Sequence, residues 1–238
     1  NASYLSKSRA VSLKEAGLKR ITVSLDAVDE ETFRTVCDVE FPVSRVLAGI
    51  ESARQAGFEN IKINAVIKRG LNEHSVLPLA RYFHGTGSIL RFIEYMDVGS
   101  TNNWKLDEVV SATELIALIN QELPIDPVSP NYRGEVAKRW RYADGGGEIG
   151  FITSVTESFC GDCSRVRLSA VGQIYTCLFA TEGYDIRNPL RAGASDQDLL
   201  EMIHALWGKR EDRYSELRGQ IPVAVCSGSK VEMSHIGG

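Results

Sequence analysis

The fold class of this chain is decided by residues 61–96, IKINAVIKRGLNEHSVLPLARYFHGTGSILRFIEYM. The two ends of this stretch, residues 61–68 and 89–96, are rich in β-branched and aromatic residues, which favour strands. Residues 73–83 between them predict a helix. A strand, a helix and a second strand in this order are typical of parallel strands joined by a crossover helix.

The same alternation is present closer to the N-terminus. Residues 21–26 (ITVSLD) predict a strand, Asp29 is a favourable first cap of a helix, and residues 46–56 carry apolar side chains at helical spacing before Gly57. We expect an α/β fold with a mostly parallel sheet, either open or closed as a barrel. Three such strands alone would leave a long unpaired edge, which natural proteins avoid, so we expect further strands upstream of Asn1.

The pattern changes after about residue 103. Residues 111–121 predict one more helix, and three prolines between residues 124 and 130 then mark a loop. Short strands and turns follow, with an amphipathic helix at residues 196–207. We therefore expect two domains, 1–105 and 106–238.

Composition excludes several classes of protein. A length of 238 residues, 43% of them hydrophobic and 24% charged, is enough for a buried core in one or two domains. A net charge of −4 argues against a nucleic acid polymer as partner. No apolar run approaches the ~20 residues of a membrane span. Five cysteines without a recognisable secretory signal predict metal ligation or packing rather than disulfides.

The strongest chemical signal is a cysteine motif of spacing C-x2-C-x13-C in residues 159–179, FCGDCSRVRLSAVGQIYTCLF. A turn at residues 170–172 predicts a hairpin that brings Cys163 opposite Cys177, with Cys160 beside them. Three thiolates suit an iron–sulfur cluster or zinc. A cluster would keep one iron open, whereas structural zinc would need a fourth ligand, for which Cys226 and His235 are candidates. Spacing alone leaves both metals open.

Two arginines are expected on the same side as the thiolates. Side chains alternate between the faces of a strand, so Arg165 and Arg167 should point in the direction of Cys163. Guanidinium groups bind phosphate oxygens in pairs, and two of them would suit a polyphosphate.

The sequence resembles the GTP 3′,8-cyclase family (molybdenum cofactor biosynthesis protein A) of radical S-adenosylmethionine (SAM) enzymes. Four stretches carry the resemblance: TSVTESFCGDCSRVRLSAVGQIYTCLF, LRFIEYMDVG, KINAVIKRGLNEH and the terminal IGG. It implies an incomplete (β/α)6 barrel at 1–105, with a smaller α+β domain for the cluster and the substrate at 106–238. It also implies two [4Fe-4S] clusters, of which the N-terminal one cleaves SAM through a C-x3-C-x2-C motif. This sequence contains no such motif, so we expect it to lack the radical-generating cluster and to be inactive alone.

The resemblance also assigns roles to individual residues. The implied cluster ligands are Cys160, Cys163 and Cys177. The implied GTP contacts are Lys62, Arg165, Val166 and Arg167, and the implied SAM contacts are Ser24 and Met96. The terminal Gly237 and Gly238 would enter the active site, a task that suits residues without side chains. Cys37 and Cys226 match no ligand position.

The implied activity is that of a cytoplasmic lyase. A 5′-deoxyadenosyl radical would take hydrogen from C3′ of GTP, and closure onto C8 would give 3′,8-cyclo-7,8-dihydro-GTP for molybdenum cofactor biosynthesis. A homodimer is compatible with the resemblance. The alternatives are a non-catalytic nucleotide-binding module stabilised by zinc or a cluster, and an electron carrier. Ferredoxin clusters normally use four cysteines, which disfavours the last.

Overall fold

The structure is a computed structural model and describes residues 1–99, 103–218 and 230–236. The chain forms two compact units. The first consists of Asn1–Tyr95 and Leu106–Thr156, and the second of Met96–Lys105 and Glu157–Gly238. None of the helices in the described ranges combines the length and apolar character needed to cross a lipid bilayer.

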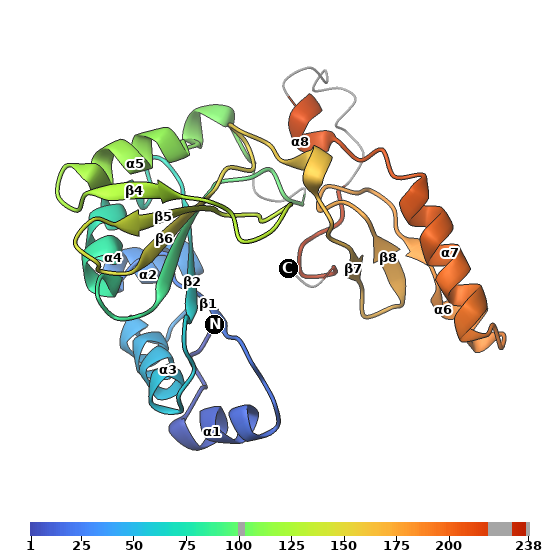
Figure 1. Ribbon diagram of the computed structural model, residues 1–238, viewed down its shortest axis with the longest axis horizontal. Helices are drawn as coiled ribbons and strands as arrows, with labels where there is room; N and C mark the ends of the chain where they lie inside the picture. Colours follow the sequence, from blue (N-terminus) through green and yellow to red (C-terminus); the bar gives the residue numbers. More distant parts are fainter. Residues whose placement is uncertain (100–102, 219–229, 237–238) are drawn as a thin grey trace. The chain divides into compact units, whose positions relative to one another are not determined.

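The first unit contains a six-stranded mixed sheet in the order β1-β2-β3-β6-β5-β4 (Figure 1). The strands are β1 (Thr22–Ser24), β2 (Lys62–Ile67), β3 (Ile89–Glu94), β4 (Ile125–Val128), β5 (Lys138–Tyr142) and β6 (Glu148–Ile152). Strands β1, β2, β3 and β6 are parallel, and β5 and β4 add an antiparallel edge. The three strands predicted from the N-terminal alternation and the parallel-rich α/β sheet are confirmed.

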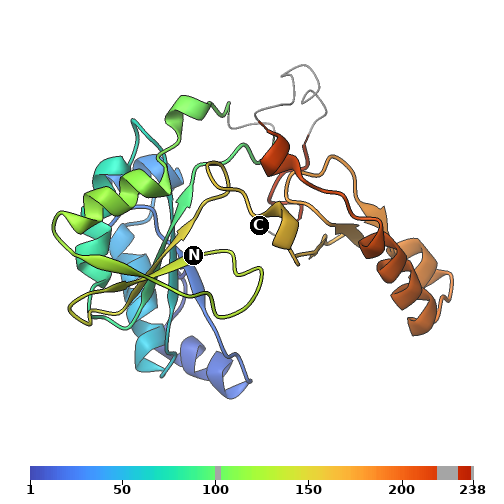
Figure 2. The ribbon, with the colours of Figure 1, turned by 45° about the horizontal axis from the view of Figure 1, so that its top comes forward.

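Helices of the first unit cover one face of this sheet in both views (Figure 1, Figure 2). They are α1 (Lys7–Glu15), α2 (Glu30–Cys37), α3 (Val43–Gln55), α4 (Val76–Phe83) and α5 (Ala112–Asn120), with short 3-10 helices η1 (Glu73–Ser75) and η2 (Leu106–Glu108). The predicted cap is confirmed, because the Asp29 carboxylate accepts the N–H of Thr32 at 2.8 Å. Helix α5 begins with a capping box in which Ser111 and Glu114 bind each other's backbone N–H.

Alternation along the strands separates a buried face from a polar face. In β2, Ile63 and Ile67 are fully buried in the core, whereas Asn64 points to the other face. The parallel registers pair Ser24 with Asn64 and Asn64 with Arg91. These three polar residues therefore form a row across the face that is turned away from the helix-covered core.

The compact units divide the chain differently from the expected segments 1–105 and 106–238. The reason is the position of β6, which pairs with β3 although β4 and β5 precede it in the chain. Hydrogen bonding to β3 draws residues 106–156 into the first unit, and residues 96–105 pack with the second.

In its described residues, the second unit contains a small antiparallel sheet, three α-helices and one 3-10 helix. The strands are β7 (Arg167–Leu168), β8 (Gln173–Tyr175) and β9 (Tyr184–Asp185); the helices are α6 (Arg187–Arg191), α7 (Asp196–Gly208) and α8 (Tyr214–Leu217), with the 3-10 helix η3 (Cys160–Asp162). The hairpin expected after the cysteine motif and the helix expected at 196–207 are both confirmed.

The hairpin register differs from the expected one. Ser169 donates its N–H to the carbonyl of Gln173 at 2.9 Å, so the turn is centred on Val171. Gly172 completes this turn at φ +78°, a backbone angle that other residues rarely adopt. Continued along both arms, this register sets Cys177 opposite Arg165 rather than opposite Cys163, because the turn is centred one residue later than expected.

The buried Glu94 generates a prediction about stability. Its side chain accepts N–H groups from Ala112 at 3.1 Å and from Val155 and Thr156 at 2.9 Å, and Glu94 is only 1% exposed. Glu94→Ala leaves these donors unpaired and should lower the free energy of unfolding by about 3 kcal/mol, measured by urea denaturation. The matched control, Glu31→Ala at an exposed helix position, should change it by less than about 0.5 kcal/mol. Equal effects of both variants would contradict the role of Glu94.

Candidate functional site

The three cysteines of the motif lie in the second unit. Cys160 is the first residue of η3. The N–H of Cys163 donates a hydrogen bond to the carbonyl of Cys160 at 3.2 Å, so a tight turn connects the two residues. Cys177 follows β8, and its sulfur accepts the N–H of Phe179 at 3.4 Å. All three thiols are partly buried and free of disulfides. The thiols are therefore available as ligands.

Alternation along the first arm of the hairpin places the two arginines on the cysteine side. Arg165 and Arg167 are partly buried like Cys163, whereas Val166 and Leu168 are 51% and 61% exposed. The structure thus shows the alternation that the spacing predicts. The side chain of Val166 points to the face opposite that of the two arginines, whereas its backbone lies between them.

Both guanidinium groups interact electrostatically with the thiols. Arg165 Nη2 lies 3.3 Å from Cys163 Sγ, and its guanidinium stacks over the ring of Phe159 at 5.0 Å. Burial and the neighbouring Arg165 lower the pKa of Arg167, while the thiolate charges of Cys163 and Cys177 oppose this shift. The hairpin therefore concentrates positive charge beside the sulfur atoms.

The surroundings shift the pKa values of Cys163 and Cys177 in opposite directions. Burial raises the pKa of Cys163, but the backbone N–H of Arg165 and the guanidinium groups of Arg210 and Arg165 outweigh it, so its pKa is lowered. Burial raises the pKa of Cys177, and the N–H of Phe179 offsets only part of this effect. Donors directed at sulfur stabilise the thiolate form, which is the form that binds metals.

Sequence reasoning missed Arg210, a third arginine at this site. It follows α7, and its Nη1 donates to the carbonyl of Cys163. Its Nε binds Asp212 at 3.2 Å, and its guanidinium lies over the ring of Trp207 at 4.8 Å. Arg210 is 47 residues from Cys163 in the chain, and no motif connects the two positions.

Three free cysteine thiols are a donor set that an iron–sulfur cluster with one open iron could use. Among the described residues, no three His, Cys, Asp or Glu side chains are arranged to hold one metal ion. Zinc would need four donors at about 2.0–2.3 Å. Of the candidate fourth ligands, His235 lies with its ring edge-on to Tyr175 at 6.2 Å, and Cys226 is outside the described residues. Two of the three free thiols, Cys163 and Cys177, accept N–H donors at sulfur, and hydrogen bonds to the sulfurs are one of the features that tune iron–sulfur clusters.

Lys62 lies in the first unit, in a cavity of about 120 Å³. Arg91, Tyr132 and Glu135 also line this cavity. Burial lowers the pKa of Lys62, and the charge of Arg91 adds to this effect. Arg91 is held by Asn64, whose side-chain oxygen accepts its Nε–H at 2.9 Å. Sequence analysis gave Arg91 no role, although its position on the polar face of β3 follows from the alternation.

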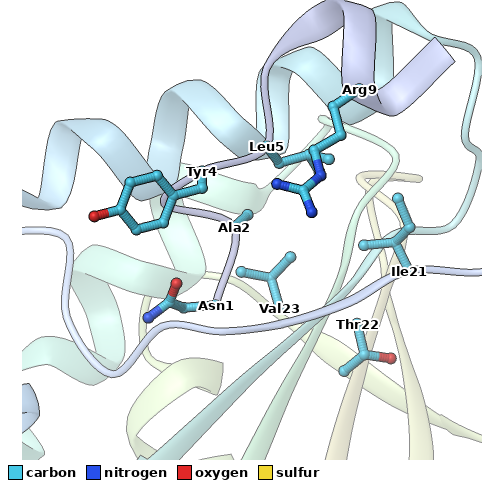
Figure 3. Close-up of a pocket in the computed structure, with 8 residues that line it drawn as sticks. All are labelled: Asn1, Ala2, Tyr4, Leu5, Arg9, Ile21, Thr22 and Val23. Atoms are coloured by element: carbon cyan, nitrogen blue, oxygen red, sulfur yellow. The ribbon is translucent and has the colours of Figure 1, made fainter. Parts of the chain in front are cut away.

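The two residues expected to contact SAM lie in different units. Ser24 is exposed at the end of β1 in the first unit, and Met96, partly buried, belongs to the second. A separate hollow of about 300 Å³ lies at the N-terminal part of the edge strand β1. Figure 3 shows Arg9 reaching from α1 over the apolar side chains of Leu5 and Ile21 in this hollow. Ser24 is not among the residues that line it.

The C-terminal segment, residues 230–236, packs in the second unit. Val231 donates its N–H to Ala180 at 3.2 Å, and Ile236 is only 1% exposed. The residues that precede the terminal glycines are therefore docked rather than frayed. Gly237 and Gly238 themselves lie outside the described residues.

Comparison with known families divides the chain into two parts. Residues 1–83 match the Radical SAM superfamily, and residues 88–216 match the family described as Molybdenum Cofactor Synthesis C. The two matches define a class of protein in which a radical SAM region is followed by a region specific to molybdenum cofactor synthesis.

Individual relatives define the family within this class. The chain is 47% identical to a GTP 3′,8-cyclase of Acidothermus cellulolyticus, an alignment that covers 100% of this chain and 72% of the relative. It is 48% identical to that of Xanthomonas axonopodis pv. citri, covering 100% and 70%, and 42% identical to that of Staphylococcus carnosus, covering 98% and 69%. The chain belongs to the GTP 3′,8-cyclase family.

The cysteine site predicts a spectroscopic result. Anaerobic reconstitution with iron and sulfide should give the broad brown absorption of a cluster, because Cys160, Cys163 and Cys177 supply three thiol ligands. Serine at Cys160, Cys163 or Cys177 should abolish this band and most of the bound iron. The control Cys37→Ser should retain both, since Cys37 lies in α2 and burial raises its pKa to about 11. A colourless, zinc-loaded protein would overturn the cluster assignment.

Proposed function

We propose that this chain binds GTP and contributes the substrate side of a GTP 3′,8-cyclase, a lyase that forms 3′,8-cyclo-7,8-dihydroguanosine 5′-triphosphate in molybdenum cofactor biosynthesis. The observation that carries the proposal is the hairpin, on which Cys163, Arg165 and Arg167 share one face. The printed names of the relatives supply the reaction.

In this proposal the hairpin recognises both ends of the nucleotide. A [4Fe-4S] cluster on Cys160, Cys163 and Cys177 would supply one open iron as a Lewis-acid site for the guanine. Arg165 and Arg167 bind the triphosphate, because guanidinium groups form paired, charge-assisted hydrogen bonds with phosphate oxygens. The backbone of Val166, between them, supplies the remaining contact.

The first unit contributes a second cationic surface. Lys62 and Arg91 share one cavity, and burial lowers the pKa of each. A bound phosphate would relieve the unfavourable burial of two positive charges. We assign Lys62 as a GTP contact on this ground, with Arg91 beside it.

The remaining parts of the proposal follow the family. The row of polar residues on the sheet would face the interior of an incomplete (β/α)6 barrel, with Ser24 and Met96 as SAM contacts. 5′-Deoxyadenosyl radical chemistry depends on a C-x3-C-x2-C motif. The five cysteines of this sequence, at 37, 160, 163, 177 and 226, do not form that motif. This observation favours nucleotide binding without turnover as the second candidate function of the 238-residue chain.

The missing motif predicts that the 238-residue chain does not turn over GTP. Protein with a reconstituted cluster, supplied with GTP, SAM and a strong reductant, should form no cyclised nucleotide, because no cysteine set remains for reductive cleavage of SAM. Mass spectrometry of the nucleotide fraction measures this, and calorimetry on the same sample should show that GTP still binds. Detection of the cyclised product would refute the prediction.

The arginines predict a loss of affinity without a loss of metal. Arg165→Ala or Arg167→Ala should weaken GTP binding by about 1.5–3 kcal/mol, roughly 10- to 150-fold in Kd, since each removes a charge-assisted hydrogen bond. Iron content should stay unchanged because neither side chain binds iron. The control Arg191→Ala removes an exposed arginine of α6 and should leave Kd unchanged. Unchanged GTP affinity combined with loss of iron would show that the arginines serve the cluster instead.

A further inference from the structure

A buried ion cluster forms around Asp97 in the second unit. Asp97 is 8% exposed, and its Oδ2 accepts the hydroxyl of Tyr214 at 2.5 Å and Lys230 Nζ at 2.7 Å. Its Oδ1 pairs with Arg218 Nη2 at 2.6 Å. The side chains of both cations are nearly buried, with 9% of Arg218 and 11% of Lys230 exposed. One carboxylate thus pairs with two cations in a shielded place.

Aromatic rings complete the surroundings of the two cations. Phe179 stacks on Tyr214 with ring centroids 4.7 Å apart. Lys230 Nζ lies 4.5 Å from the centre of the Tyr214 ring, and the Arg218 guanidinium lies 5.0 Å from that of Phe179. The faces of aromatic rings attract cations, most strongly where water is excluded.

The ion cluster around Asp97 joins segments that are far apart in the chain. Asp97 follows β3, Phe179 comes two residues after Cys177, Tyr214 opens α8, and Lys230 begins the C-terminal segment. Two further bonds strengthen the connection to the cysteine hairpin. Val231 donates to Ala180, and on the α8 side Glu216 accepts the N–H of Gly161 at 3.1 Å.

We propose that Asp97 is a positioning residue that docks residues 230–236 on the cysteine hairpin. The charge of Asp97 is essential to this role, because Lys230 and Arg218 lie around the same carboxylate. Removing the negative charge takes a shared ion-pair partner from two shielded cations, so the free energy of keeping Lys230 and its segment in place becomes less favourable. Docking in turn fixes the chain that leads into Gly237. The consequence for GTP rests on the proposed function, whereas the docking itself does not.

The substitution Asp97→Asn tests the proposal in the 238-residue chain. Asparagine keeps the shape and can still accept the Tyr214 hydroxyl, but it removes the charge. Hydrogen exchange of the peptide covering 230–236, followed by mass spectrometry, should accelerate by about tenfold or more. Lys230→Met, which removes the partner and leaves Asp97 paired with Arg218, should have the same effect. The single variant Lys230→Arg keeps the positive charge, so its peptide 230–236 should exchange as slowly as in the unsubstituted protein. The control Glu51→Gln breaks an exposed ion pair with Arg54 in α3 and should leave the exchange unchanged.

The same experiment separates docking from overall stability. Peptides of β2 in the first unit should exchange at their original rate, and reconstituted iron should be retained. Unchanged exchange at 230–236 in both Asp97→Asn and Lys230→Met would overturn the proposal. An equal acceleration in β2 would also overturn it, because Asp97 would then support the fold as a whole.

Nucleotide binding provides a second, distinguishable readout. If the tail helps to arrange the GTP site, Asp97→Asn should weaken GTP binding in parallel with the faster exchange. Failure of the unsubstituted protein to bind GTP would contradict the proposed function, while the exchange result would still decide whether Asp97 docks the segment.

Discussion

The buried carboxylate of Glu94 binds the chain of the first unit close to two of the three places where the chain passes between the units. Tyr95, the next residue, is the last of the first unit before the chain enters the second. Thr156, whose N–H binds Glu94, is the last residue before the chain enters it again. The N–H of Ala112 at the start of α5 binds the same carboxylate after the chain has returned. A charge buried in this way is tolerated only because several donors surround it, so the start of α5 and the last residues of β6's segment depend on one side chain.

Cationic side chains also lie in partly buried places, and they do so in pairs. Arg165 and Arg167 face partly buried thiols, and Lys62 shares a cavity with Arg91. In each place cations are close to one another in partly dry surroundings, which costs free energy in the absence of an anion. In the proposed function, the phosphate groups of GTP would add negative charge in both places, beside Glu135 in the first unit and beside the thiols in the second. The net charge of −4 gives no hint of this, since it averages over the whole chain.

The sequence predicted local structure well and long-range pairing less well. The strands at 21–26, 61–68 and 89–96 and the cap at Asp29 depend on neighbouring residues, and all of them appear in the structure. The hairpin was located correctly, but its register was wrong because a shift of one residue in the turn centre changes every partner. The pairing of β6 with β3 could not be predicted, since strand order depends on contacts between distant segments.

For the candidate site too, the sequence predicted residues that are close together in the chain and missed those that come from distant segments. The motif itself indicates Cys160, Cys163, Arg165 and Arg167, because they lie close together in the chain. Arg210 donates to the carbonyl of Cys163 from 47 residues away, and no periodicity relates it to the motif. Asp97 is equally hidden, because its partners Tyr214 and Lys230 lie 117 and 133 residues further on.

The strand order has a consequence for synthesis on the ribosome. Strand β6 separates β3 from β5 in the sheet, so the first unit cannot complete its sheet until residue 152 has left the exit tunnel. Residues 96–105 leave the ribosome before their packing partners in the second unit, because the rest of that unit begins only at residue 157. Chains with many such distant pairings fold slowly and expose apolar surface in the meantime. The nascent polypeptide therefore carries an unfinished sheet edge at β3 while more than fifty further residues are translated.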